Sequence, residues 1–224
     1  MNNINIFDII GPVMIGPSSS HTAGASRLGL IARRLLGEKP KTAVITLYGS
    51  FALTYSGHGV DRAIIGGILG YESDDLRLRN SFKYAIEEGL EYKFLLSSEE
   101  TEHPNTVEIS LTGESGDTVT MVAQSVGAGR IEVISINGSD VLFSAEYDTT
   151  IIFNADKPGL IAHISAIFAE FGMNIAFMRV FRKFEGKDAI MVIETDQKIC
   201  DEVILRLKHI PDVNKVITVP PFKL

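Results

Sequence analysis

Hydrophobic and polar positions in the front part of the chain alternate between helical and extended patterns. Apolar residues recur at helical spacing over residues 25–36, which predicts a helix that is capped by Ser20 or Thr22 and ended by Gly37. The same reasoning predicts a buried strand at 43–49, helices at 60–70 and 75–89, and a strand at 92–96.

Residues 105–146 change to a period of two. Apolar residues at 107, 109 and 111, and again at 119, 121 and 123, alternate with polar neighbours, which is typical of strands with one buried face. A GESGD turn separates these two runs, and Asn137-Gly138 is a strong hairpin signal. An antiparallel meander that follows mixed helices and strands predicts an α+β domain, which we place at residues 1–146.

The last part of the chain predicts the element order βαββαβ, a ferredoxin-like split unit. Its strands are expected at 149–153, 174–184, 189–195 and 213–219, and its helices at 159–171 and 198–208. We therefore expect a second domain at 147–224.

Two glycine-rich segments have structural interpretations. Gly66 and Gly67 weaken a predicted helix, which indicates that another element packs closely against it. Gly127–Arg130 lies between two predicted strands, so a bulge or tight connection is favoured over a dinucleotide-binding loop.

Composition narrows the class of protein. Hydrophobic residues make up 45% of the 224, as in an ordinary globular chain. The net charge is −7 and no basic tract is present, which argues against nucleic-acid binding. The N-terminal MNNINIFDII lacks the basic start of a signal peptide, and no apolar run is long enough to cross a membrane. A soluble cytoplasmic protein is expected.

Cys200 is the chain's only cysteine. It excludes an intrachain disulfide, and also any iron–sulfur or zinc site built from several cysteines of this chain. Cys200 lies in the helix predicted at 198–208 among apolar residues, so we expect it to pack rather than to react.

The segment GPSSSHTAG at Gly16–Gly24 is the strongest candidate site. Hydroxyls and backbone N–H groups at the start of a helix attract a carboxylate or a phosphate, and His21 can transfer a proton near neutral pH. The alternative is a plain capping loop with a surface histidine. A Walker loop is excluded because no Gly-Lys-Ser/Thr follows.

Two further loops carry a histidine beside glycine or proline. In Ser56–Asp61 the residue is His58, and in Glu102–Thr106 His103 and Asn105 flank a proline. Each is as compatible with a simple polar turn as with a site. Convergence of the loops would bring three histidines together, and zinc binding is a weaker alternative because no ligand spacing is present.

A further candidate site lies in the C-terminal domain. Asp156 is expected to cap the next helix, and Gly159 permits close approach of a ligand. Asn174 begins the following strand and is placed to face the same pocket.

Three motifs together resemble the β chain of bacterial iron–sulfur-dependent L-serine dehydratase. They are IGPVMIGPSSSHTAG at Ile10–Gly24, SGHGVD at Ser56–Asp61 and HPNT at His103–Thr106. The tail from about Tyr147 resembles an ACT domain, because DKPGLI and GMNI occur in order. The front domain of that family is similar to the allosteric substrate-binding domain of some phosphoglycerate dehydrogenases.

The resemblance implies a lyase that converts L-serine to pyruvate and ammonia. In that family a [4Fe–4S] cluster with an open iron site acts as a Lewis acid on the substrate hydroxyl, and a separate α chain supplies its cysteines. The single cysteine here agrees with a cluster held by the α chain, so no metal ligand is expected in this chain. The resemblance thus implies two partners, the α chain and L-serine.

Site roles follow from the resemblance. His21 is expected to handle a proton or position the substrate hydroxyl, and the base that removes the α proton is not identified. Residues expected to bind substrate are Ser18, Ser19, Ser20, Thr22, His58, His103 and Asn105. Residues expected to bind an effector in the ACT domain are Asp156, Gly159, Leu160, Asn174 and Ile175. An ACT sheet edge is also expected to form a homodimer.

Two other functions compete with a catalytic subunit. The chain can be a non-catalytic amino-acid sensor, with effector sites in one or both domains. It can also be a dimerisation module that joins two copies through the ACT sheet.

Overall fold

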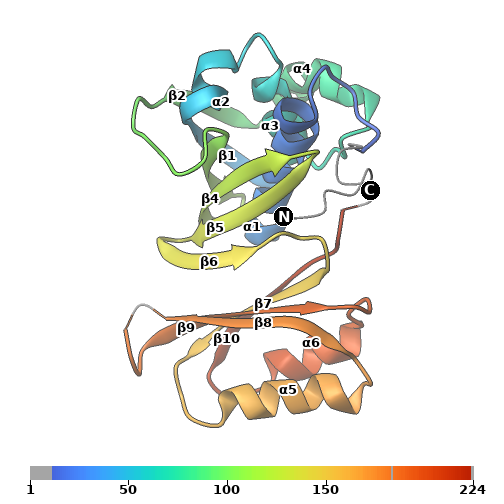
Figure 1. Ribbon diagram of the computed structural model, residues 1–224, viewed down its shortest axis with the longest axis vertical. Helices are drawn as coiled ribbons and strands as arrows, with labels where there is room; N and C mark the ends of the chain where they lie inside the picture. Colours follow the sequence, from blue (N-terminus) through green and yellow to red (C-terminus); the bar gives the residue numbers. More distant parts are fainter. Residues whose placement is uncertain (1–11, 183, 223–224) are drawn as a thin grey trace, which may run out of the picture. The chain divides into compact units, whose positions relative to one another are not determined.

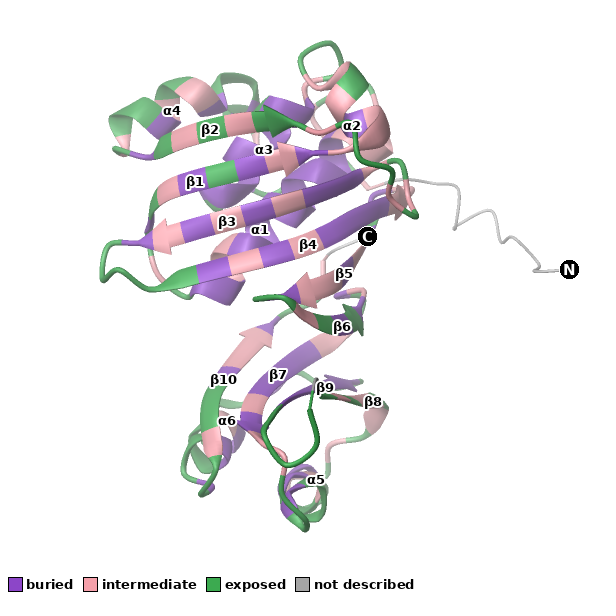
Figure 2. Ribbon diagram, turned by 90° about the vertical axis from the view of Figure 1, so that its left-hand side faces the viewer, coloured by how far each residue is buried: buried purple, intermediate pink, exposed green. Residues whose placement is uncertain are grey.

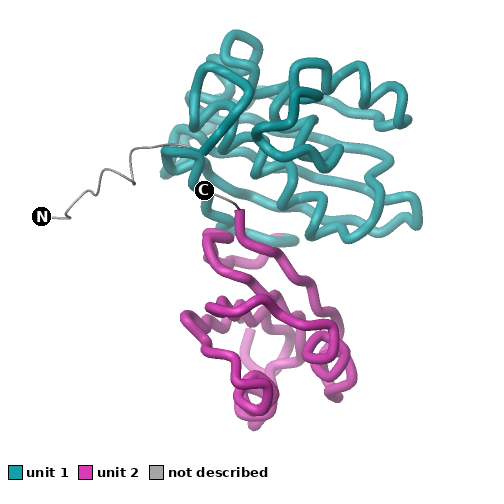
Figure 3. The backbone as a smooth tube through the Cα atoms, turned by 90° about the vertical axis from the view of Figure 1, so that its right-hand side faces the viewer, with its two compact units in different colours: residues 1–137, 223–224 teal, residues 138–222 magenta. Residues whose placement is uncertain are grey.

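The computed structural model describes residues 12–182 and 184–222. These residues form two compact units, which are coloured separately in Figure 3, with the break between Asn137 and Gly138. The domain boundary at 146/147 stays a prediction. The motif segment that begins at Ile10 starts outside the described residues, as does the N-terminal MNNINIFDII.

The first sheet has the strand order β2-β1-β3-β4-β5-β6. Strands β1 and β2 are parallel, whereas β1 with β3, β3 with β4, and β4 with β5 pair antiparallel. The bounds are β1 Pro40–Leu47, β2 Glu91–Leu96, β3 Thr106–Gly113, β4 Thr118–Gly127, β5 Arg130–Ile136 and β6 Ser139–Phe143. The predicted meander is confirmed. Asn137 and Gly138 at its last hairpin both have positive φ, as a two-residue type I′ turn requires.

Helices fill the connections before the meander. They are the π-helical turn η2 (Ser19–Gly24), α1 (Ala25–Leu36), α2 (Gly49–Thr54), α3 (Val60–Ile68), the 3₁₀ turn η3 (Leu76–Asn80) and α4 (Ser81–Glu87). Gly37 ends α1 in the left-handed conformation, as predicted. The single helix predicted at 75–89 is instead η3 followed by α4, because Asn80, the last residue of η3, leaves helical backbone angles.

Close packing of α1 on α3 explains the glycines of the second helix. A Cβ added to Gly67 would overlap the backbone carbonyl oxygen of Ser26, and one added to Gly29 would overlap that of Ile64. The two backbones therefore meet at a distance that only glycine permits. The packing inferred from Gly66 and Gly67 is confirmed: α1 is the partner at Gly67, whereas Gly66 packs on Leu78 of η3.

The sheet of the first unit is buried on alternate residues. In β3, Val107, Ile109 and Leu111 are buried while the residues between them are partly exposed (Figure 2). Leu28, Ile31 and Leu35 of α1 are fully buried. This alternation is the period of two seen in the sequence, and α1 packs on β3 and β4 of this sheet.

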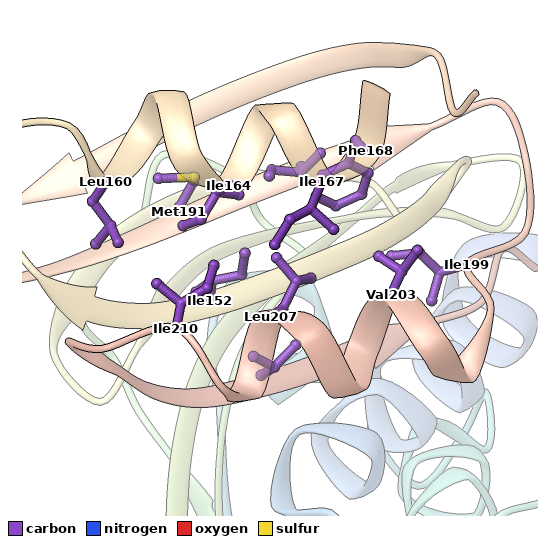
Figure 4. Close-up of a cluster of buried hydrophobic side chains, with 12 residues drawn as sticks. Ile152, Leu160, Ile164, Ile167, Phe168, Met191, Ile199, Val203, Leu207 and Ile210 are labelled. Atoms are coloured by element: carbon purple, nitrogen blue, oxygen red, sulfur yellow. The ribbon is translucent and has the colours of Figure 1, made fainter. Parts of the chain in front are cut away.

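After β6, the second unit has the predicted order βαββαβ (Figure 1). The bounds are β7 Asp148–Ala155, α5 Leu160–Glu170, β8 Ile175–Arg182, β9 Asp188–Thr195, α6 Asp201–Lys208 and β10 Val213–Val219. The sheet order is β10-β7-β9-β8, and every pair is antiparallel. Side chains of α5 and α6, including Ile164, Phe168, Val203 and Leu207, pack on Ile152 and Met191 of the sheet (Figure 4).

Cys200 does not pack inside a helix, so that prediction was wrong. It is the extended residue just before α6, and its side chain is exposed. The buried residue at this helix start is its neighbour Ile199. Within the described residues, no helix is both long and apolar enough to cross a membrane.

Candidate functional site

The Gly16–Gly24 segment folds as a helical turn that positions His21. Ser18 is extended, and its hydroxyl oxygen accepts a hydrogen bond from the backbone N–H of His21. The same oxygen lies 3.2 Å from Nδ1 of the His21 ring. The N-cap is therefore Ser18, not Ser20 or Thr22 as predicted, because η2 extends the helical run toward the N-terminus by one turn.

Ser50 contacts the other side of the His21 ring. Its hydroxyl oxygen lies 3.1 Å from Nε2. Ser50 follows β1 in α2, and its backbone N–H donates to the Pro104 carbonyl over 2.7 Å. Gly49 permits this approach, since its φ is +49° and an added Cβ would lie 2.6 Å from the Pro104 oxygen. Both ring nitrogens of His21 are thus held by serine hydroxyls.

The surroundings of His21 favour its neutral form. Its ring is edge-on to His58, with ring centroids 5.1 Å apart, and to Phe51 at 5.5 Å. Burial, and then the charge of His58, lower the pKa of His21 from its usual value. A neutral imidazole has one N–H and one acceptor nitrogen, so it donates to one serine and accepts from the other. The lowered pKa keeps the ring mostly neutral near neutral pH.

A cavity of about 280 Å³ lies beside these histidines. Of the predicted residues from Ser18 to Thr22, Thr22 lines the cavity. His58 of the second loop lines it as well. Its other lining residues are Ile15, Gly16, Pro17, Ser56, Gly57, Gly59, Arg62, Ala63, Leu78 and Arg79. His21 itself is not among the lining residues, but its ring contacts that of His58, which is.

The third loop is linked to the first loop by hydrogen bonds through Ser125. The His103 ring turns inward on its own loop, where Nδ1 accepts from the backbone N–H of Asn105 over 3.1 Å. Asn105 donates from Nδ2 to the Ser125 carbonyl, and the Ser125 hydroxyl donates to the Ser20 carbonyl over 3.0 Å. The three loops converge as the sequence suggested, but neither His103 nor Asn105 lines the cavity.

Three residues of this region were not predicted from the sequence. They are Ser50, Arg62 and Arg79. A serine directly after a buried strand was the signal for Ser50, because strand ends commonly position site residues. The arginines lie in segments that we interpreted only as helices. No group of three or more His, Cys, Asp or Glu side chains gathers to hold a metal in the part of the chain that the structure describes.

Asp156 does not cap α5, which corrects that prediction. Its Oδ2 accepts from Nη1 of Arg182 over 3.0 Å and from the backbone N–H of Gly186 over 2.9 Å. These two contacts, the backbone one first, lower the pKa of Asp156. The N-cap position belongs to Gly159, which has a φ of +86°. Asp156 therefore fastens the β8–β9 connection to the end of β7.

Asn174 and Gly159 do not share a pocket within one chain. The register pairs Ala155 with Asp188 at one end of β9, and Ile175 with Thr195 at the other end. Seven residues of strand separate these ends, roughly 23 Å. Asn174 instead donates from Nδ2 to Asp196 and from its backbone N–H to Gln197. Leu160 lies with Gly159, and Ile175 lies with Asn174.

Comparison with known proteins gives two domain matches and several long alignments. The family model described as serine dehydratase beta chain matches residues 5–88, and that of the ACT domain matches residues 149–211. The probable L-serine dehydratase beta chain of Bacillus subtilis (strain 168) is 41% identical over 212 residues, or 95% of this chain and 96% of that protein.

Two further relatives extend this result. The L-serine dehydratase beta chain of Peptoniphilus asaccharolyticus is 33% identical over 91% of this chain and 92% of its own length. The D-3-phosphoglycerate dehydrogenase of Bacillus subtilis (strain 168) is 25% identical over 86% of this chain, but only 36% of that protein is covered.

The fold and the matches define a two-part α+β chain whose C-terminal part is an ACT domain. The chain belongs to the family of L-serine dehydratase beta chains, because the alignments at 41% and 33% identity span nearly all of both partners. The resemblance of the chain to this family is confirmed.

Proposed function

We propose that this chain is the β subunit of an L-serine ammonia-lyase, which converts L-serine to pyruvate and ammonia together with an α chain. The observation that carries the proposal is the His21 ring, which is held between Ser18 and Ser50 and contacts His58 of the cavity lining. A neutral imidazole next to a cavity suits proton transfer. The relatives named as L-serine dehydratase beta chains supply the substrate.

The described residues of this chain do not fit a [4Fe–4S] cluster. Such a cluster needs several thiolates, whereas the single cysteine, Cys200, lies exposed before α6 in the second unit. The cluster expected in this family is therefore assigned to the partner α chain. We derive no step of the reaction through it.

This chain's own contribution is to bind the substrate and handle a proton. Elimination removes the α proton and the β hydroxyl of serine, and hydrolysis of the resulting enamine then yields pyruvate and ammonia. Ser18 and Ser50 hold the His21 ring in one orientation, so that a proton passing by way of His58 or a serine hydroxyl meets a fixed acceptor. The base that removes the α proton is left to the complete complex.

The decisive experiment is anaerobic co-purification with a cysteine-rich α chain, followed by a pyruvate assay. The complex is expected to be active on L-serine, whereas this chain alone is expected to be colourless and inactive. An α chain that is fully active by itself would contradict a catalytic role, and would favour an amino-acid sensor or dimerisation module. A brown, cluster-bearing preparation of this chain alone would contradict the division between chains.

A second test addresses His21 directly. Replacement of His21 by alanine in the complex is expected to lower kcat/KM for L-serine about 100-fold, the usual scale for a positioned acid–base group. Folding is expected to survive, because the ring is only partly buried. Activity equal to wild type would place the proton-handling group elsewhere.

We also propose that the ACT domain forms a homodimer and binds a small amino acid at the seam. Strand β8 is a sheet edge, and Phe177 and Val180 on it are 44% and 40% exposed. Antiparallel pairing of two β8 edges would bring Asn174 of one copy toward Gly159 of the other. That pairing would unite the two halves of the predicted effector site, with L-serine as the proposed effector.

A further inference from the structure

The cavity beside the histidines is positively charged in an acidic chain. Arg62 of α3 and Arg79 of η3 line it, and no Asp or Glu is among its lining residues. Neither guanidinium has an ion-pair partner among the described residues, although other exposed arginines of this unit do, such as Arg77 with Asp75. The acid that precedes Arg62 in the chain, Asp61, accepts at Oδ1 from the Arg62 backbone N–H.

The lining of the cavity also includes a residue with a buried, unpartnered hydroxyl. Thr22 is only 4% exposed, and its Oγ1 makes no hydrogen bond within the described chain. An unsatisfied buried hydroxyl is costly unless a ligand or water meets it. Gly16 packs directly on this side chain, since an added Cβ there would overlap the Thr22 side chain. Thr22 is thus held against the cavity wall.

A carboxylate is a chemical match for these groups. Two guanidinium groups donate in the fork geometry that matches carboxylate oxygens. The Thr22 hydroxyl adds a further donor, while His58 lines the same space. A ligand held at the arginines therefore presents its remaining groups to His58, whose ring contacts that of His21.

We infer that Arg62 and Arg79 bind the carboxylate of the amino-acid substrate in this cavity, with the Thr22 hydroxyl as an additional hydrogen-bond donor. The identity of that substrate as L-serine rests on the proposed function. The inference moves carboxylate recognition from the Ser18–Ser20 hydroxyls to the two arginines. Ser18 is then left to orient His21, and the hydroxyl and amino groups of the substrate lie toward His58.

The kinetic test uses Arg62→Gln, Arg79→Gln and the double variant in the αβ complex. Loss of a charge-assisted hydrogen bond to an exposed arginine is expected to raise KM for L-serine about 10-fold for each variant, with kcat nearly unchanged. L-alanine, which lacks the leaving hydroxyl, should lose affinity as a competitive inhibitor to the same extent. L-alaninamide, which lacks the carboxylate, should inhibit all forms equally.

Lys83→Gln is the matched control. It removes one exposed cation from α4, next to η3 in the chain, outside the cavity lining. It is expected to leave KM unchanged, which separates local binding from a general loss of positive charge. An unchanged KM in the double variant, in a complex that is active, would overturn the inference while leaving the proposed function intact.

A binding readout on the full chain is independent of catalysis. The ring resonances of His58, assigned with His58→Asn, are expected to shift when millimolar L-serine is added and not when L-serinamide is added. In the double arginine variant, the His58 resonances should not shift with either compound. If the complex proves inactive but this pattern holds, the proposed function fails and the carboxylate site stands. A serine-induced shift that persists in the double variant, or its absence in wild type, would overturn the site.

Discussion

The Nε2 atom of His21 lies 3.1 Å from the hydroxyl oxygen of Ser50, 29 residues further along the chain. Ser50 is fixed in turn by its backbone bond to Pro104, so one residue joins the first and third loops of the site. Ser18 holds the other ring nitrogen from within the first loop. The orientation of the imidazole therefore depends on Ser50, which lies outside every predicted motif, as well as on Ser18.

Ser50 is predicted to be a positioning residue. Ser50→Ala removes the Nε2 partner and is expected to lower kcat for L-serine about 10-fold, with KM little changed, because the ring can then rotate away from its working orientation. Ser50→Thr keeps the hydroxyl and should restore most of the loss, which a purely structural role would not require. Ser110→Ala, which removes a hydroxyl on the exposed sheet face, is the control for steady-state kinetics.

His21 is predicted to make stability depend on pH. Its folded pKa is lowered by burial and by His58, so the unfolded chain takes up a proton first as the solution is acidified. Stability is then fully present above the unfolded pKa, about 6.5, and falls as pH decreases from there toward the lower folded value. Urea unfolding at several pH values should show this slope, and His21→Gln should reduce it. An unchanged slope would contradict the prediction.

The contact between α1 and α3 is predicted to tolerate no side chain at Gly67. The added Cβ of Gly67→Ala would overlap the Ser26 carbonyl, so we expect a loss of about 2 kcal/mol or more in the free energy of unfolding. Alanine favours a helix over glycine by about 1 kcal/mol, so a loss reports packing alone. In the control Gly57→Ala, the Cβ would lie 3.7 Å from the Thr54 carbonyl oxygen, and stability should barely change. Equal midpoints in urea for the two variants would refute this.

The β8 edge is predicted to carry the homodimer contact. Val180→Lys places a charge on that edge and is expected to shift the full chain from dimer to monomer in sedimentation experiments. Leu205→Lys is the control, since Leu205 is 56% exposed on α6, away from the sheet edge. If both variants remain dimeric, the contact lies elsewhere. If the wild-type chain is a monomer, the proposed seam is wrong.

The amino-acid sequence by itself determined the elements and the order in which they occur. Periodicity is a local property, so the helix at 25–36, the meander after residue 105 and the βαββαβ unit could be predicted without any partner. The Gly66-Gly67 pair also indicated a close contact, because glycine in a helix is unfavourable without such a reason. The histidine loops were found as well, since glycine, proline and serine mark segments that are not regular structure.

Only the tertiary structure decided which side chains meet. The pairing of β1 with β3 brings Ser50 to Pro104 and so to His21, and this depends on strand register across residues far apart in the chain. Arg62 and Arg79 were indistinguishable from solvent-exposed helix residues until α3 and η3 were placed around one cavity. Asn174 and Gly159 lie at opposite ends of β9 for the same reason, because register sets position along a sheet and local sequence does not.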